Sequence, residues 1–372
     1  MIRKLIEELK SLPDFAEEIL YHRSIPSQPP RHRAPQRPLP AGLETALRQL
    51  GIPALYTHQA QALDAVRQGR HIVVVTPTAS GKTLTYNLPV LETCQEKEGH
   101  HALYLFPLKA LAQDQLKSLE ELRKAWSAGG PLNVAIYDGD TSLALRKKIR
   151  ERPPQILITN PDMLHLGILG YHYQWEVFFR GLRYIVVDEL HSYRGIFGSH
   201  IAQLFRRLRR VCEGYGTRPQ FIACSATIAN PGEFAETLVG QPFQVIEENG
   251  APRAGGHFLF LNPQASPYTT ATRLFTLAVQ RGHKTIAFTK ARKITELMHT
   301  WVLQRSPELA PWVSSYRSGF LPQERREIEA GLAGGRLKGV ISTSALEMGI
   351  DIGGMEVCLL VGYPGTIMAT WQ

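Results

Sequence analysis

Short apolar runs alternate with longer amphipathic stretches between residues 58 and 225. The apolar runs are rich in β-branched residues and have the length of strands, whereas the amphipathic stretches have the length of surface helices. Strands and helices that alternate with short connections predict a parallel sheet covered by helices on both faces. The strands predicted in this region are residues 71–75, 102–106, 133–137, 156–159, 184–187 and 221–224.

A second series with the same rhythm begins near residue 257. It is separated from the first by residues 231–256, where closely spaced turn formers mark an inter-domain connection. We therefore predict an α/β fold of two tandem domains with parallel sheets, residues 41–250 and residues 251–372. The strands predicted in the second domain are residues 257–261, 285–288, 312–316, 339–342 and 357–361.

The first 40 residues follow a different pattern and are predicted to be an extension. Residues 1–12 place apolar side chains at helical spacing between charged ones, which predicts an amphipathic helix rather than a signal peptide. Residues 22–40 are rich in proline and arginine and hold few large apolar side chains, so they cannot form a core of their own. This stretch is either a linker or a basic arm that lies along a nucleic acid.

Composition narrows the class of protein. The chain has 42 lysines and arginines against 33 acidic residues, and the net charge of +9 favours a polyanionic partner. Its four cysteines form no C-x-x-C pair, which argues against a disulfide framework and against a zinc site. No apolar run approaches the ~18 residues of a membrane span. We therefore expect a cytoplasmic protein that does not enter a membrane, while its oligomeric state stays open.

The loop after the first predicted strand has the composition of a phosphate-binding loop. Residues 76–83 read TPTASGKT, and a helix-like stretch follows. A strand, a loop of small residues and Lys-Thr at a helix start together form a cradle for phosphates. Thr76 stands where the general pattern has its first glycine. The residues predicted to bind ATP here are Thr78, Ala79, Ser80, Gly81, Lys82 and Thr83.

An acidic pair at the end of another predicted strand supplies the second half of an ATP site. Residues 184–187 are apolar and are followed directly by Asp188 and Glu189. Magnesium prefers hard oxygen ligands, so the Thr83 hydroxyl and the Asp188 carboxylate are predicted to hold Mg²⁺. Glu189 is then placed to orient and deprotonate the attacking water.

With both halves present, the chain resembles the superfamily-two helicases of the DExH-box type. Residues 188–191, Asp-Glu-Leu-His, stand as the DExH box. The resemblance implies two RecA-like domains and a catalytic set of Lys82, Asp188, Glu189 and His191. It also implies that Tyr56 and Gln59 contact the adenine. The Ser-Ala-Thr motif of this family, which couples hydrolysis to domain movement, is formed by Ser225, Ala226 and Thr227.

The same resemblance assigns residues to a nucleic-acid surface. In the first domain these residues are Lys109, Asn160 and Asp162, and in the second they are Thr289, Arg292, Ser318, Gly319 and Thr343. Gly349 and Asp351 are implied to face the nucleotide. Residues 199–212 carry four arginines, which form either a solvated helix face or a further part of this surface.

A finer resemblance comes from the sequences LYTHQ, GIFGSH, LEMGIDIGG and LLVGYPGT. Together they are similar to the stand-alone DNA repair helicases typified by the bacterial mitomycin repair factor and the fungal RecQ-four-like helicase. This implies a 3′-to-5′ DNA helicase whose family also has a four-cysteine metal site. Trp371 and Gln372 resemble the start of the last helicase motif, and the arginines of that motif do not follow within these 372 residues. We therefore expect this chain to bind ATP, Mg²⁺ and DNA but to hydrolyse ATP slowly.

Two other functions remain open from the sequence. An RNA helicase shares the same motifs, and only the finer resemblance favours DNA, single-stranded or partly duplex, as the partner. A non-catalytic module that binds ATP and nucleic acid would also fit a chain without the final arginines. A P-loop kinase is disfavoured, since it leaves the second α/β domain unexplained.

Overall fold

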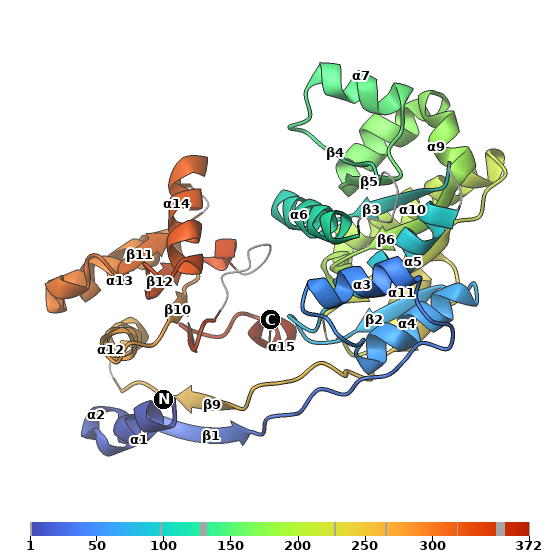
Figure 1. Ribbon diagram of the computed structural model, residues 1–372. Coiled ribbons are helices and arrows are strands. Elements are labelled where there is room, and N and C mark those ends of the chain that lie inside the picture. The colour runs from blue at the N-terminus through green and yellow to red at the C-terminus, as the bar shows by residue number, and fades with distance from the viewer. Residues whose placement is uncertain are drawn as a thin grey trace. The chain divides into compact units, whose positions relative to one another are not determined.

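The computed structural model describes residues 2–96, 99–126, 132–226, 228–264, 266–317, 319–346 and 354–371. It divides into two compact units, which are each described by themselves (Figure 1). Residues 28–253 form one unit, named here the P-loop unit. Residues 1–27 and 254–372 form the other, named here the composite unit. Four predicted site residues lie outside the described residues: Thr227, Ser318, Gly349 and Asp351.

A seven-stranded parallel sheet forms the centre of the P-loop unit, with strand order β4-β5-β3-β6-β7-β2-β8. Six of its strands coincide with predicted ones, which confirms the parallel α/β fold. The short edge strand β8 was not predicted. The strands are β2 (Ile72–Val75), β3 (His101–Leu105), β4 (Val134–Tyr137), β5 (Ile156–Thr159), β6 (Leu182–Val187), β7 (Gln220–Ser225) and β8 (Gln244–Ile246).

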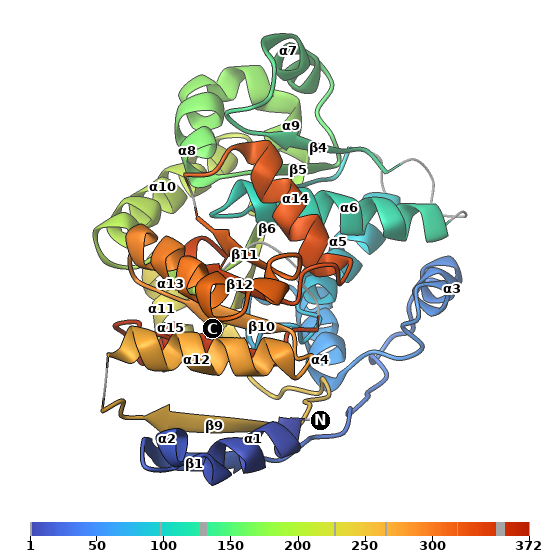
Figure 2. The ribbon, with the colours of Figure 1, turned by 90° about the vertical axis from the view of Figure 1, so that its left-hand side faces the viewer.

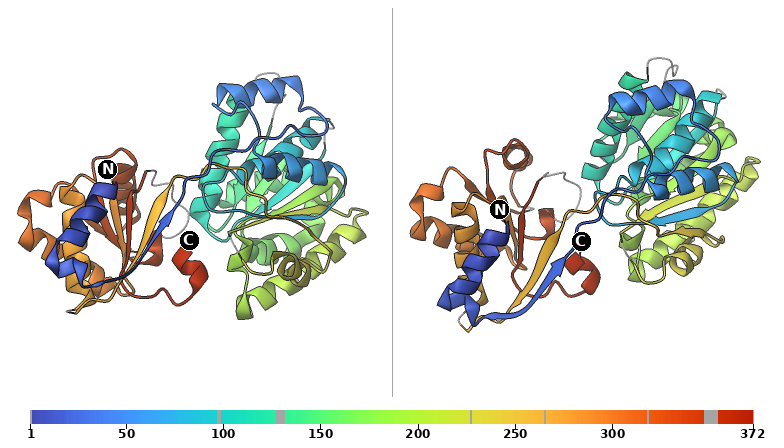
Figure 3. Two further views of the ribbon diagram at one scale, coloured as in Figure 1. Left: turned by 90° about the horizontal axis from the view of Figure 1, so that it is seen from below. Right: turned by 60° about the horizontal axis from the view of Figure 1, so that its bottom comes forward.

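Helices cover both faces of this sheet, as Figure 3 shows. Ile72 and Val74 face one layer, while Val73 and Val75 face the other, so β2 is apolar at every position. The first layer contains α3 (Ala41–Gln49), α4 (Thr57–Arg67), α5 (Thr83–Glu96) and α6 (Lys109–Ala125). The second contains α7 (Leu143–Glu151), α9 (Glu176–Gly181), α10 (Gly195–Gly214) and α11 (Pro231–Val239). The short helix α8 (Pro161–Met163) follows β5.

The composite unit contains a four-stranded parallel sheet of order β11-β12-β10-β13. Phe275 and Met298 pack on one face of it, and Leu332 packs on the other. The strands are β10 (Thr285–Phe288), β11 (Val313–Tyr316), β12 (Gly339–Ser342) and β13 (Val357–Leu360). The helices are α12 (Pro267–Gln280), α13 (Arg292–Arg305), α14 (Pro322–Ala333) and α15 (Ile367–Trp371).

One strand predicted for the second parallel sheet lies elsewhere, and that prediction was wrong. Strand β9 (Gly256–Leu261) pairs antiparallel with β1 (Ile19–Ile25) and forms a separate two-stranded sheet, visible in Figure 2. Local pattern could not reveal this pairing, because the partner strand lies more than 230 residues earlier. The predicted N-terminal helix is α1 (Ile2–Ser11), followed by α2 (Pro13–Ala16).

Residues 1–27 are part of the composite unit rather than a free extension. Glu8 of α1 forms an ion pair with Arg281. Phe15 is 3% exposed, and the Arg273 guanidinium lies over its ring at 5.0 Å. Leu5 and Ile6 of α1 are buried, and α1 and α2 are held to the C-terminal half of the chain by Arg281 and Arg273.

The proline- and arginine-rich residues from 28 onward are anchored to the P-loop unit through their backbone. The Arg31 amide donates to Gly250 O at 2.8 Å, and the Thr57 amide donates to Arg31 O at 3.0 Å. Gln28 and Arg253 form an antiparallel bridge. This stretch therefore packs beside the start of α4, next to Tyr56. No helix among the described residues is long and apolar enough to cross a membrane.

Gly250 tests this packing, because a Cβ at this position would lie 2.2 Å from Thr57 Oγ1 and 2.5 Å from Arg31 O. We expect Gly250→Ala to lower the free energy of unfolding by about 1–3 kcal/mol, since backbone would have to move. Gly214→Ala is the control, because nothing lies within 4 Å of a Cβ there. Urea denaturation of both variants checks the prediction, and equal stability of the two would contradict it.

Candidate functional site

The loop between β2 and α5 has the backbone shape of a phosphate cradle. Ala79 and Gly81 have positive φ values of 58° and 75°. The Thr76 hydroxyl is buried and lies 2.6 Å from the Ser80 hydroxyl, so threonine at this position ties the loop together from inside. The Lys82 ammonium donates to Thr76 O and Pro77 O, both at 2.9 Å. Thr78 and Ala79 are exposed at the tip of the loop.

Gln59 connects this loop to the start of α4. Its side-chain amide donates to Gly81 O at 2.9 Å, and its carbonyl oxygen accepts from the Tyr56 amide at 2.9 Å. A Cβ on Gly81 would lie 2.7 Å from Gln59 Nε2, so glycine is needed for this contact as well as for its positive φ. Tyr56 and Gln59, the two residues predicted to contact adenine, are therefore held beside the loop.

The acidic pair follows β6, two strands from β2 in the sheet. The Glu189 backbone is left-handed, with φ of 47°, and its amide donates to Asp188 Oδ1 at 2.8 Å. Burial, and then the negative charge of Asp188, raise the pKa of Glu189 to about 7, against the opposing charge of Lys82. Lys82 is therefore close enough to lower the pKa of the Glu189 carboxyl through its charge. A strained backbone and a raised pKa on one partly buried carboxyl are typical of functional positions.

His191 links the acidic pair to the end of β7. Its Nδ1 lies 3.4 Å from Glu189 Oε2, 3.4 Å from Ser225 Oγ and 3.3 Å from the Ala226 amide. Burial lowers the pKa of His191 to about 4, so its ring is neutral at pH 7. A neutral Nδ1 accepts the Ala226 N–H, which fixes the orientation of the ring. The DExH box and the first two residues of the Ser-Ala-Thr motif are therefore in direct contact.

The raised pKa of Glu189 predicts a pH-dependent stability of the metal-free protein. Because the folded-state pKa of about 7 exceeds the ordinary 4.5, the folded chain binds the proton more tightly, and stability falls as pH rises from 4.5 through 7. Glu189→Gln removes this penalty. We expect the variant to exceed the wild type by about 1–3 kcal/mol at pH 8 and to match it near pH 4.5. Denaturation in EDTA at both pH values measures this.

The exposed Glu247→Gln is the control for that experiment, since it removes a carboxylate of the same kind from the surface. Its effect on the free energy of unfolding should be equal at both pH values. A stability difference for Glu189→Gln that does not grow with pH would contradict the prediction.

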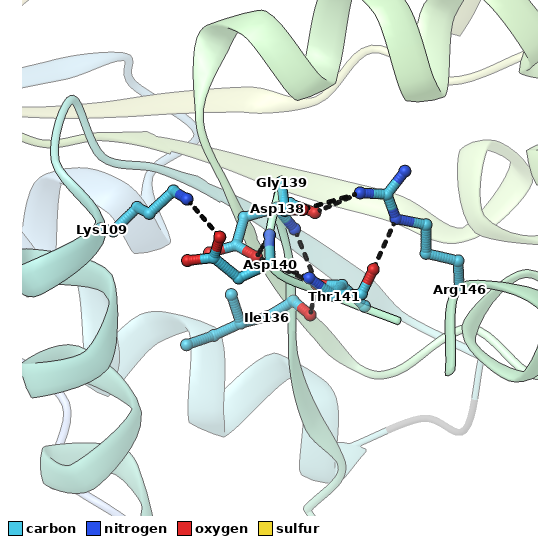
Figure 4. Close-up of polar contacts among 7 residues, drawn as sticks. All are labelled: Lys109, Ile136, Asp138, Gly139, Asp140, Thr141 and Arg146. Carbon is cyan, nitrogen blue, oxygen red and sulfur yellow. Dashed lines mark hydrogen bonds and ion pairs between the residues drawn. The ribbon is translucent and has the colours of Figure 1, made fainter. Parts of the chain in front are cut away.

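A second group of polar residues lies at the carboxyl ends of β3, β4 and β5. Lys109 begins α6, and its ammonium lies 2.7 Å from Asp140 Oδ1 (Figure 4). Asp138 Oδ1 accepts from the amides of Asp140 and Thr141, so the loop after β4 is an ordered turn. Arg146 closes the turn by donating to Thr141 O at 2.9 Å and Asp138 O at 2.8 Å. Figure 4 shows Lys109 and Arg146 on opposite sides of this turn.

The sequence reading did not single out residues 138–141. A signal was present, because the run Asp-Gly-Asp-Thr follows a predicted strand and must lie at the same sheet edge as the other motifs. Asn160, which was predicted, lies nearby after β5. Its side chain accepts from the Met163 amide at 2.9 Å and caps α8, while Asp162 is exposed in the first turn of that helix.

In the composite unit, the predicted residues lie at the carboxyl ends of β10 and β12. The Thr289 amide donates to Ser342 O at 2.8 Å, so Thr289 and Thr343 are neighbours. The Thr289 hydroxyl is buried and lies 2.7 Å from the Thr295 hydroxyl. Arg292 is exposed at the start of α13, and Gly319 is exposed after β11.

The four arginines of α10 do not form one surface. Arg207 donates to Leu169 O at 3.0 Å. Arg209 donates to Val239 O and Gly240 O at 3.2 and 3.0 Å, where α11 ends and carbonyls lack helical partners. Arg206 and Arg210 are exposed. Two of the four arginines thus hold the fold together, and the other two are left for the solvated face.

Both halves of the chain match known helicase domains. Residues 56–234 match the DEAD/DEAH box helicase family, and residues 268–372 match the helicase conserved C-terminal domain. The uncharacterized ATP-dependent helicase YprA of Bacillus subtilis is 44% identical over 385 residues, covering 100% of this chain and 50% of YprA. The ATP-dependent helicase hrq1 of Schizosaccharomyces pombe is 35% identical, covering 98% of this chain and 36% of that protein.

Among solved structures, the DUF1998 helicase MrfA bound to DNA and AMPPNP is similar with a TM-score of 0.93 and 43% identity. The match covers 99% of this chain and 52% of that one. This chain therefore spans about half the length of these relatives, or less. From the two domain matches and these similarities, the chain belongs to the superfamily-two helicases, in the group of stand-alone helicases that includes YprA, Hrq1 and MrfA.

Proposed function

We propose that this chain is an ATP-dependent motor of a DNA helicase that moves 3′ to 5′ along one strand and acts in DNA repair. The observation that carries the proposal is the convergence of Lys82, the acidic pair and His191 at one edge of the P-loop sheet. Support for DNA over RNA comes from MrfA, whose similar structure is bound to DNA. Comparing the stimulation of ATP hydrolysis by single-stranded DNA and by RNA of the same sequence tests this choice.

ATP phosphates would replace the loop carbonyls as partners of Lys82. The Lys82 ammonium now donates to Thr76 O and Pro77 O, which are acceptors that a phosphate oxygen outcompetes by its charge. Backbone N–H groups of the loop and the start of α5 supply further donors. Tyr56 and Gln59 lie beside the loop and would contact the base.

Mg²⁺ fits the donors that the site offers. The Thr83 hydroxyl and the Asp188 carboxylate are hard oxygen ligands, and Asp188 Oδ2 accepts a hydrogen bond from the buried phenol of Tyr86. Thr83 and Asp188 would hold the ion. When bound, Mg²⁺ would neutralise charge on the phosphates.

Glu189 would orient the attacking water and accept its proton. The pKa of Glu189 is raised to about 7, which is close to neutral pH. A general base is most effective when its pKa lies near the pH of the reaction. Neutral His191 lies between the Glu189 carboxyl on one side and the Ser225 hydroxyl and Ala226 amide on the other. It would therefore transmit a change in the protonation of Glu189 to the end of β7.

Lys109 is proposed to bind a phosphate of the nucleic acid, which would compete with its exposed partner Asp140. We expect Lys109→Ala to weaken binding of single-stranded DNA about three- to tenfold. The slope of log K against log salt should fall by about one, because one phosphate contact is lost. Fluorescence anisotropy titrations at several salt concentrations measure both quantities.

Lys117→Ala is the matched control, since it removes the same charge two turns further along α6. Its affinity and its salt slope should remain close to those of the wild type. If the two variants weaken DNA binding equally, Lys109 acts through general charge and the assigned contact is wrong.

A further inference from the structure

A buried tyrosine contacts one of the side chains that the proposed function assigns to Mg²⁺. Tyr86 lies on α5, three residues after Thr83, and is 1% exposed. Its hydroxyl lies 3.2 Å from Asp188 Oδ2 and 3.0 Å from Gln115 Oε1. One hydroxyl group therefore contacts both the strand-end carboxylate and helix α6.

The partners of the phenol determine which way it donates. A phenol has one proton, and an ionised carboxylate can only accept, so Tyr86 donates to Asp188. Gln115 Oε1 is a second acceptor beside the phenol at 3.0 Å, and Gln115 Nε2 donates to Asn87 Oδ1 at 3.3 Å. The Tyr104 hydroxyl donates to the same Asn87 oxygen at 2.9 Å. The Tyr86 hydroxyl therefore lies between the Asp188 carboxylate and a pair of buried amides.

This contact completes the support of the carboxylate. Oδ1 of Asp188 accepts from the Glu189 amide at 2.8 Å, and Oδ2 accepts from Tyr86. Each oxygen thus has one fixed donor, which leaves the carboxylate a single orientation. The ring of Tyr86 packs edge-on against that of Tyr104, with 5.4 Å between the ring centroids. A phenylalanine ring could make the same packing contact, so packing does not explain the hydroxyl.

We propose that Tyr86 is a positioning residue, which holds Asp188 in the orientation that receives Mg²⁺ and is itself held by Gln115 of α6. The proposal rests on the proposed function of the P-loop unit as a site for ATP and Mg²⁺. It assigns no contact between Tyr86 and the nucleotide. Partners that orient metal ligands in this way typically change metal affinity by about 10- to 100-fold.

The test is a titration of Mg²⁺ that reports on nucleotide binding rather than on hydrolysis. A fluorescent ATP analogue is bound first in EDTA and then at rising Mg²⁺ concentration. For Tyr86→Phe we expect the Mg²⁺ concentration at half-maximal tightening to rise about tenfold, while affinity in EDTA stays unchanged. Gln115→Leu should shift it in the same direction by about threefold, since support of the phenol is lost.

Tyr104→Phe is the matched control, because it removes a hydroxyl from the neighbouring ring of the same buried cluster without a contact to Asp188. Its Mg²⁺ requirement should equal that of the wild type. The proposal is overturned if Tyr86→Phe and Tyr104→Phe have the same Mg²⁺ requirement, or if Tyr86→Phe weakens binding equally in EDTA. If Tyr86→Phe does not fold, an unshifted Gln115→Leu overturns it. A wild-type chain that binds no analogue at any Mg²⁺ concentration would instead refute the proposed function.

Discussion

Glu189→Gln should lower the single-turnover rate of ATP hydrolysis by about 10³-fold, because the amide cannot accept the proton of the attacking water. Binding of ATP should remain, since Lys82 and the loop that holds the phosphates are untouched. The backbone at Glu189 is left-handed, and burial raises the pKa of its carboxyl to about 7, which suits a base at neutral pH. Single-turnover hydrolysis with radiolabelled ATP measures the loss.

Glu213→Gln, on the exposed end of α10, serves as the control with an equal change of charge. It should hydrolyse ATP at the wild-type rate. If Glu189→Gln retains most of the wild-type rate, another residue acts as the base and the role assigned to the DExH box in this chain is wrong.

Lys82→Ala should weaken the binding of ATP by about 10- to 100-fold, which corresponds to loss of a charge-assisted hydrogen bond. Two loop carbonyls would also lose their donor, so part of the effect comes from a rearranged loop. Equilibrium binding of a fluorescent ATP analogue in the presence of Mg²⁺ measures the affinity.

The exposed Lys148→Ala removes the same charge from α7 and should bind the analogue as the wild type does. Equal affinities of Lys82→Ala and Lys148→Ala would mean that the loop does not bind phosphate. That result would contradict the ATP site as a whole, since the acidic pair alone holds no nucleotide.

Most strands of the P-loop sheet were predictable because they are buried on both faces and appear as continuous apolar runs. In Ile72–Val75 every residue is buried, so the strand and the loop after it could be located together. The phosphate-binding loop, the acidic pair and the Ser-Ala-Thr motif then followed from position, since each begins at or directly after the end of such a strand. The contacts of His191 Nδ1 with the Ser225 hydroxyl and the Ala226 amide are the spatial counterpart of motifs that lie 34 residues apart in the sequence.

Contacts between distant segments could not be predicted in this way. The pairing of β1 with β9 depends on tertiary structure, and a single apolar run gives no information about its partner. The role of Tyr86 was hidden for a related reason, because a tyrosine on an apolar helix face has the pattern of an ordinary core residue. Only the position of its hydroxyl, between Asp188 and Gln115, distinguishes it from packing.

The same limit applies to the arginines of α10, which lie close together in the sequence and look alike there. Arg209 caps the end of α11, whereas Arg210, the next residue, is exposed. Their charge is equal in the sequence, and their roles differ only because α11 ends beside one of them. The sequence can therefore identify a basic helix, but the role of each arginine depends on the groups that its guanidinium contacts in the structure.

The proposed function requires this chain to bind ATP and DNA at coupled sites, and the affinity for ATP with and without DNA tests this requirement most directly. The fluorescent analogue is titrated with the chain in Mg²⁺, once alone and once with saturating single-stranded DNA. We predict that DNA tightens binding of the analogue, and that the analogue tightens binding of DNA by the same factor, as linkage requires. An affinity for the analogue that is unchanged by DNA, or that needs neither Mg²⁺ nor Lys82, would contradict the account.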